Sequence, residues 1–242
     1  MTNRITDTSQ RNTARIAGFL YLLIVLCALF SMMYVPSKLI VWRDAATTAK
    51  NIMASELLFR FGIVGDSVVF VSEIALTVLL YILLKPVNKT LALVSAFSRL
   101  AMAVIQGINL LNLFFVLFLL SGAAYLTVFN ADQLHALVML FLNAHENGVY
   151  VWGVFFGFHL MVLGYLVFKS GFFPRMPGVL MMIGSLGYLM ESYSNFLSVN
   201  NEAISTITSF FLATSVIGEF SFMFWLLLKG VKVQQTATRK AN

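Results

Sequence analysis

Residues 57–84 read LLFRFGIVGDSVVFVSEIALTVLLYILL, an apolar run broken only by a few charged residues. A helix needs about 20 apolar residues to cross a bilayer. This run is longer, so we expect it to tilt or to project one end into the head groups. Lys85-Pro-Val-Asn88 follows it, and a second long apolar run begins at Leu91. Proline has no amide proton and disfavours helix in the residue before it. The two runs therefore predict a sharp helical hairpin within a membrane.

Four further apolar runs are expected to cross the membrane, because the whole chain has the composition of a membrane protein. Of its 242 residues, 60% are hydrophobic and 11% charged, whereas soluble domains average about 25% charged. This excludes a soluble globular fold and a disordered chain, and we find no second domain. We predict an all-α polytopic membrane helix bundle that forms one integral membrane domain over residues 1–242. Its six transmembrane helices are expected at 16–35, 57–84, 91–121, 149–168, 178–199 and 204–228.

The distribution of lysine and arginine predicts the orientation. With the N-terminus inside, the inner set is Arg4, Arg11, Arg15, Lys85, Lys89, Lys169, Arg175, Lys229, Lys232, Arg239 and Lys240. The outer set is Lys38, Arg43 and Lys50. Basic residues favour the cytoplasmic side, so we predict that both termini are cytoplasmic. The net charge of +6 follows from this orientation, and we expect the lipid bilayer, not nucleic acid, as the partner.

A short amphipathic helix is predicted on the outer side. Asn130-Ala-Asp-Gln133 has the pattern of a capping box, and apolar residues then recur at helical spacing over 134–142. About 13 residues give only about 20 Å of helix, too short to span. We expect this helix to lie on the outer surface or to cap the bundle, either as a connector or as a lid. A weaker pattern of the same kind covers 44–56.

Four ionisable residues from four different spans are expected at one depth. Glu73, Arg99, His159 and Glu219 each lie 10–12 residues from an inner basic residue, which places them about 15–18 Å deep. A charge in hydrocarbon costs at least about 2.5–3.5 kcal/mol, so each needs a partner or water. The tight hairpin makes Glu73 and Arg99 the expected ion pair.

A second polar layer is expected nearer the outer face. Its members come from three spans and the outer connection: Asp66, Glu191, Gln106, Asn109, Arg60 and His145. Asp66 lies seven residues before Glu73 and shares its helix face. Together the two layers form a polar seam from the middle of the bilayer to the outer surface. Such residues either hold helices together or line a path for a ligand or protons, and both interpretations stay open.

No catalytic motif is found. The three histidines, His135, His145 and His159, contain no His-x-x-x-His pair, which argues against a three-histidine zinc site. The Gly-x-Ser-x-Gly, Walker A, dinucleotide-binding and c-type haem patterns are absent, and one cysteine allows no intramolecular disulfide. A mixed site of His159 with Glu73 or Glu219 stays geometrically possible. We expect no metal and no cofactor, and the sequence favours a non-enzymatic protein.

Several motifs resemble a bacterial multi-pass membrane family catalogued only as a domain of unknown function. They are Ala14-Arg-Ile-Ala-Gly-Phe-Leu-Tyr21, Ser55-Glu-Leu-Leu-Phe-Arg-Phe-Gly-Ile-Val-Gly-Asp66, Leu80-Tyr-Ile-Leu-Leu-Lys-Pro-Val-Asn88, Ser121-Gly-Ala-Ala-Tyr125, Phe155-Phe-Gly-Phe-His159 and Tyr165-Leu-Val-Phe-Lys-Ser-Gly-Phe-Phe-Pro174. The resemblance implies about six spans in a bacterial cytoplasmic membrane and no particular reaction. It draws attention to Arg60, Asp66, Arg99, His145 and His159. Members usually carry Asp where Glu73 and Glu191 stand here.

These observations favour an integral membrane protein that binds or moves a small polar or amphipathic ligand, or protons, through a polar intramembrane cavity. Glu73, Arg99, His159 and Glu219 would form its floor. One alternative is a lipid-modifying membrane enzyme, metal-assisted with His159 as a ligand. Another is a non-catalytic scaffold or sensor whose charges only hold helices together. A small-molecule ligand is expected under the first interpretation, and the sequence does not give the oligomeric state.

Overall fold

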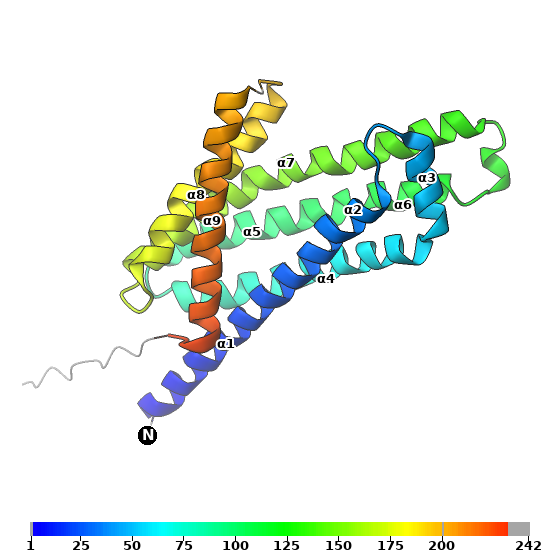
Figure 1. Cartoon of the computed structure of the whole chain (residues 1–242). Helices are drawn as coiled ribbons and strands as arrows, with labels where there is room; N and C mark the ends of the chain where they lie inside the picture. Colours follow the sequence, from blue (N-terminus) through cyan, green and yellow to red (C-terminus); the bar gives the residue numbers. More distant parts are fainter. Residues whose placement is uncertain (1, 200, 232–242) are drawn as a thin grey trace, which may run out of the picture.

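A computed structural model describes residues 2–199 and 201–231, and all regular structure in these ranges is helical. The elements in chain order are α1 (Thr2–Ala28), the π-helix η1 (Leu29–Tyr34), α2 (Val35–Leu39), α3 (Ala45–Ala54), α4 (Glu56–Leu84), α5 (Lys89–Asn109), α6 (Leu111–Leu119), the 3-10 turn η2 (Ala124–Leu126), α7 (Ala131–Lys169), α8 (Arg175–Phe196) and α9 (Glu202–Leu228). They form one helix bundle, as predicted (Figure 1).

A helix covers most of each of the six predicted spans. In the part of the chain that the structure describes, five helices are long and apolar enough to cross a membrane: Ser9–Leu39, Glu56–Leu84, Lys89–Leu119, Ala131–Lys169 and Glu202–Leu228. The helix over the fifth predicted span, α8, is not among them, because glycine, serine and Glu191 dilute its apolar residues. It nevertheless packs between α7 and α9. That α8 crosses the membrane stays a prediction.

The predicted short outer helix is not a separate element. Asn130 and Gln133 form the expected capping box, but the helix that begins there continues without a break into the fourth span as α7. Its 39 residues reach about 58 Å, so one end extends well beyond a hydrocarbon core of about 30 Å. The polar residues 143–147 include no proline or other helix breaker, which is why the helix does not stop there.

The third predicted span is interrupted once, at Leu110, which separates α5 from α6. The side chain of Asn112 donates to the carbonyl of Asn109 at 3.1 Å, and the Nδ1 of His145 lies 3.2 Å from the same oxygen. The amide of Leu113 bonds instead to Leu110 at 3.0 Å. Side chains that interrupt the backbone hydrogen bonds between residues i and i−4 are a known cause of helix breaks.

The first span ends in the π-helical turn η1 just before Pro36. A proline ring would clash with the carbonyl four residues earlier in a regular helix, and a wider π turn relieves that clash.

Beyond α2 the chain turns into α3, whose N-cap is Asp44. The side-chain and backbone hydrogen bonds from Thr47 hold the pKa of Asp44 below its ordinary value. This confirms the weaker short helix predicted over 44–56.

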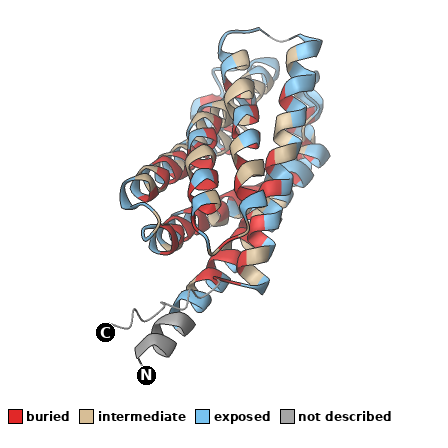
Figure 2. Cartoon of the chain, turned by 90° about the vertical axis from the view of Figure 1, so that its left-hand side faces the viewer, coloured by how far each residue is buried: buried red, intermediate tan, exposed pale blue. Residues whose placement is uncertain are grey.

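Helix α7 lies at the centre of the contacts and packs against α3, α5, α6 and α8. On the other side of the bundle α1 packs on α4 and crosses α9 (Figure 1). A Cβ on Gly18 would lie 2.5 Å from the backbone nitrogen of Leu227, so the two helices touch there. They diverge from this crossing towards the α3 end of the bundle (Figure 1). Figure 2 shows buried residues lining the inner faces of the helices.

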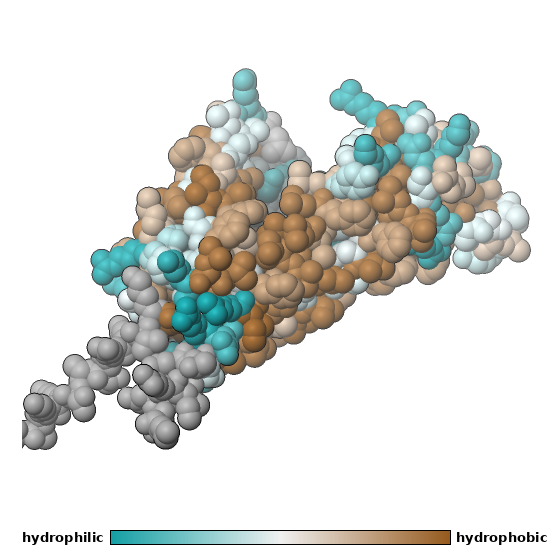
Figure 3. Space-filling view, turned by 60° about the horizontal axis from the view of Figure 1, so that its bottom comes forward, coloured by the Kyte–Doolittle hydropathy of each residue, from teal (hydrophilic) through white to brown (hydrophobic). Residues whose placement is uncertain are grey.

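Charged residues gather at the two ends of the molecule and leave an apolar belt between them (Figure 3). The predicted inner residues Lys85, Lys89, Lys169, Arg175 and Lys229 lie at helix ends or in the turns between helices, and Arg11 and Arg15 lie within α1, before its crossing with α9 at Gly18. The predicted outer residues Lys38, Arg43 and Lys50 lie in α2, in the turn after it and in α3. Lys232, Arg239 and Lys240 lie outside the described residues. The structure thus separates the two sets, and the cytoplasmic location of the termini stays a prediction.

We predict that Gly184→Ala destabilises the bundle at the contact between α8 and α9. A Cβ on Gly184 would lie 2.4 Å from the Cα of Ser215, so the helices must separate. Overpacking of this kind costs about 1–3 kcal/mol, which thermal unfolding in one detergent would measure. Gly107→Ala is the matched control, because its Cβ would meet only the Phe70 ring at 4.0 Å. Equal melting temperatures for both variants would contradict the close contact.

Candidate functional site

Polar side chains separate two apolar cores. The first core holds Leu76, Leu160 and Phe222, and the second holds Ile63 and Val116 near α3. Asp66 lies on α4 between residues of the two cores, and Gln106 occupies the corresponding position on α5. Burying polar groups costs free energy unless they are hydrogen-bonded, so the bonds within this layer decide what it can do.

The centre of the layer is the ion pair that the hairpin predicts. Arg99 Nε donates to Glu73 Oε2 at 2.5 Å, and the two side chains are 1% and 4% exposed. Arg99 Nη1 also donates to the hydroxyl of Tyr21 at 3.3 Å, and the guanidinium lies 5.0 Å from the centre of the Tyr21 ring. Helices α1, α4 and α5 therefore meet at one buried cation.

His159 joins this cluster as a hydrogen-bond acceptor. Its Nδ1 lies 2.8 Å from the carbonyl oxygen of Ser95, which can only accept, so Nδ1 carries the proton. Its Nε2 lies 2.8 Å from Arg99 Nη1, which can only donate, so Nε2 presents a lone pair. The geometry assigns a neutral imidazole that links α7 to the Arg99 guanidinium.

The hydrogen bonds of His159 also argue against the alternative of a metal-assisted enzyme in which His159 is a metal ligand. A metal ligand needs a free lone pair on the imidazole, and Arg99 occupies the one that His159 offers. Within residues 2–199 and 201–231, no group of three or more His, Cys, Asp or Glu is placed to hold a metal ion. The mixed site of His159 with Glu73 or Glu219 is therefore not assembled in this arrangement.

A cleft opens beside the cluster where α1 and α9 diverge. It encloses about 420 Å³ and is lined by residues of α1, η1, α4, α5, α7, α8 and α9. Arg99 and Glu73 form part of its floor, and Glu219 faces it from α9. Leu29, Met33 and Val216 line it too and are 48%, 63% and 50% exposed. The cleft therefore leads from the apolar outer surface of the bundle to its buried charges.

Several polar groups in the cleft retain unused hydrogen-bonding capacity. Among the described residues, Gln106 Oε1 and Trp152 Nε1 are buried without a partner, and both residues line the cleft. Glu219 accepts one hydrogen bond, from the Ser215 hydroxyl at 2.9 Å. A buried polar atom without a partner costs about 1–3 kcal/mol, so these atoms favour a ligand that supplies the missing bonds.

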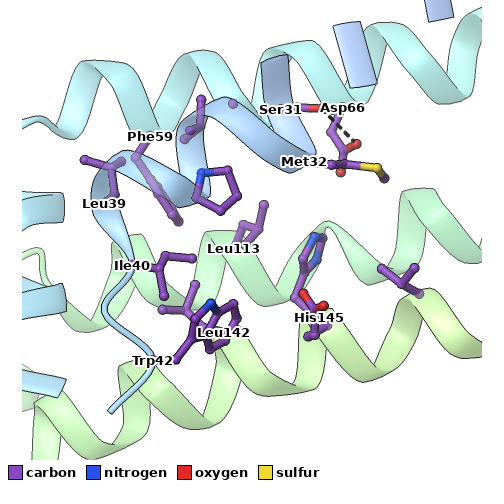
Figure 4. A pocket seen from close by; sticks show the side chains of 15 residues that line it. Ser31, Met32, Leu39, Ile40, Trp42, Phe59, Asp66, Leu113, Leu142 and His145 are labelled. Atoms are coloured by element: carbon purple, nitrogen blue, oxygen red, sulfur yellow. Dashed lines mark hydrogen bonds between the residues drawn. The ribbon is translucent and has the colours of Figure 1, made fainter. Parts of the chain in front are cut away.

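The predicted outer layer assembles in part. Gln106 Nε2 donates to Asp66 Oδ1 at 3.1 Å, and Asn109 Nδ2 donates to the carbonyl of His145 at 2.8 Å. Asp66 and His145 line a second cavity near α3 (Figure 4). Each of the two hydrogen bonds joins residues from different helices, so these four members of the predicted outer layer lie in contact.

Four predicted residues line neither cavity: His159, Asn109, Glu191 and Arg60. The last two also lie apart from the polar contacts between helices described above. Glu191 is half-buried on α8, where its backbone carbonyl accepts from Asn195 at 2.8 Å. Arg60 is 54% exposed and pairs with Glu56 one helical turn away. Their positions along the helices placed these residues in the predicted outer layer, but such a position does not fix the direction in which a helix face points.

Three residues outside the two predicted polar layers complete the site. Tyr21 and Ser95 hold Arg99 and His159, and Trp152 lines the cleft. Ser95 lies four residues before Arg99 and so shares its helix face. This spacing in the sequence could have indicated that Ser95 belongs to the site. Tyr21 lies in an apolar run and carries no comparable signal.

Comparison with known proteins identifies the family. The family model described as "Domain of unknown function (DUF4386)" matches residues 16–230. An "Uncharacterized protein" of Archaeoglobus fulgidus is 30% identical over 178 residues, which cover 74% of this chain and 89% of that protein. No solved structure matches this chain.

We predict strong coupling between Glu73 and Arg99. Removing one partner of a buried ion pair costs about 3–5 kcal/mol, whereas replacing both can be nearly neutral. Glu73→Gln and Arg99→Met should each destabilise the protein, and the double variant should regain most of the loss, as measured by unfolding in one detergent. Glu56→Gln removes an exposed pair and should cost at most about 1 kcal/mol. Additive losses of stability in the double variant would contradict strong coupling between Glu73 and Arg99.

Proposed function

The chain belongs to the DUF4386 family, and we propose that it is an integral membrane protein that binds an amphipathic molecule taken from the bilayer. The ligand lies in the cleft between α1 and α9, with its apolar chain at the mouth and its polar head group on the floor. A bound molecule of this kind agrees with the apolar helices of the fold.

One observation carries the proposal: a single cavity joins exposed apolar residues to buried charges. Met33 and Val216 at the mouth are surfaces that lipid would contact, and Arg99 lies on the floor. A volume of about 420 Å³ falls within the roughly 300–1,000 Å³ of typical small-molecule sites. A ligand entering sideways from lipid never has to pass its apolar chain through water.

The floor selects the chemistry of the head group. Glu73 already neutralises Arg99, so the cation is not free to bind an anion. Gln106 Oε1 and one oxygen of Glu219 are acceptors without a donor among the described residues. The head group should therefore donate hydrogen bonds, as hydroxyl or amine groups do.

We predict that Val216→Trp blocks the cleft. Val216 lines the mouth, and an indole there would fill the entrance. The probe is monolaurin, a single-chain molecule with two hydroxyl donors, and methyl laurate is the analogue without donors. Native mass spectrometry from detergent should show one monolaurin per wild-type chain, at least tenfold weaker binding by Val216→Trp, and no comparable binding of methyl laurate.

Val71→Trp is the matched control. Val71 lies on α4, is 59% exposed and does not line the cleft, so this variant should bind monolaurin as the wild type does. Equal binding by wild type and Val216→Trp, or equal binding of the two probes, would contradict the proposal. The buried charges would then act only to hold the helices together.

A further inference from the structure

A second cavity lies nearer α3, on the other side of the hydrogen bond from Gln106 to Asp66. It encloses about 290 Å³ and is formed by η1, α2 and the turn that follows α2, and by α4, α6 and α7 (Figure 4). Met32 is the one residue shared by the described linings of this cavity and the cleft. The two spaces are therefore neighbours with different walls, and this cavity needs an explanation of its own.

A buried carboxylate forms its inner wall. Asp66 is 2% exposed, and its Oδ1 accepts from Gln106 at 3.1 Å and from Ser31 at 3.5 Å. No described residue donates a hydrogen bond to its Oδ2. The Asp66 side chain points into the cavity (Figure 4). An ionised carboxylate uses both oxygens as acceptors, so Oδ2 is left for a ligand.

The charge of the cavity favours a cation. Its lining contains two carboxylates, Asp66 and Glu146, and neither lysine nor arginine. His145 also lines it, but its Nδ1 faces the carbonyl of Asn109 at 3.2 Å, so this nitrogen donates to the backbone and not to Asp66. An anionic ligand would meet two like charges, whereas a cation would gain a partner that is removed from water.

The remaining walls are apolar and aromatic. Leu39, Phe59 and Leu142 are buried against the space, and Trp42 stands at its exposed rim. Aromatic faces attract organic cations by about 0.5–2 kcal/mol, and apolar walls favour a ligand with an apolar body. A fully hydrated metal ion would gain nothing from such walls.

We propose that this cavity binds a small organic cation, an amine with an apolar or aromatic body, whose ammonium group lies against Asp66. The ligand enters from the aqueous phase at the α3 end, past Trp42 and Glu146. The proposal goes beyond ligand binding in the cleft and does not depend on it, because the two sites have different floors and different entrances.

The test uses benzylammonium as the probe and benzyl alcohol as its neutral analogue of nearly equal shape. Equilibrium dialysis of the purified full-length protein should show one saturable benzylammonium site and no comparable binding of benzyl alcohol. Asp66→Asn keeps the oxygen that accepts from Gln106 but removes the charge, and it should weaken benzylammonium binding at least tenfold. Glu191→Gln removes a carboxylate outside both cavities and should bind as the wild type does.

Two further variants keep the result interpretable. Trp42→Ala changes a rim residue that is 47% exposed, and it should weaken benzylammonium binding severalfold. Val216→Trp blocks only the cleft and should leave this binding unchanged, which separates the two proposals. Equal affinity for benzyl alcohol, or wild-type affinity in both Asp66→Asn and Trp42→Ala, would overturn the inference. Binding of Ca²⁺ without binding of benzylammonium would also overturn it.

Discussion

The buried guanidinium of Arg99 is the constraint on which the rest of the structure depends. A permanent positive charge within the apolar core is stable only if a carboxylate pairs with it and its remaining N–H groups find acceptors. Glu73, Tyr21 and His159 supply these groups from α4, α1 and α7. These three contacts tie together helices far apart in the sequence. They also fix the neutral tautomer of His159 and thereby leave it no lone pair for a metal.

The cleft follows from how α1 and α9 meet around this cluster. Gly18 lets the two backbones touch near one end, and the ring of Tyr21 packs edge-on against Phe222 at 6.5 Å. Beyond that point α1 follows α4 while α9 follows α8. The π turn before Pro36 lies along the open side, and π turns are frequent at functional sites.

Much of this arrangement was predictable because hydropathy and proline placement dominate the fold of a membrane chain. The Lys85–Asn88 turn made Glu73 and Arg99 neighbours, and Asn130 with Gln133 marked the true start of α7. Rotation about each helix axis was not predictable, which is why Glu191 lies outside the site. The break at Leu110 depends on side chains of Asn109, Asn112 and His145 that meet only in three dimensions.

We propose that α1 and α9 enclose a ligand from the bilayer above the Arg99 cluster. A cryo-electron microscopy map of the protein in lipid nanodiscs tests it most directly. We expect elongated density between the two helices, with its polar end near Gln106 and Glu219. A map in which α1 and α9 close against each other along their length, with side chains filling the space, would contradict it.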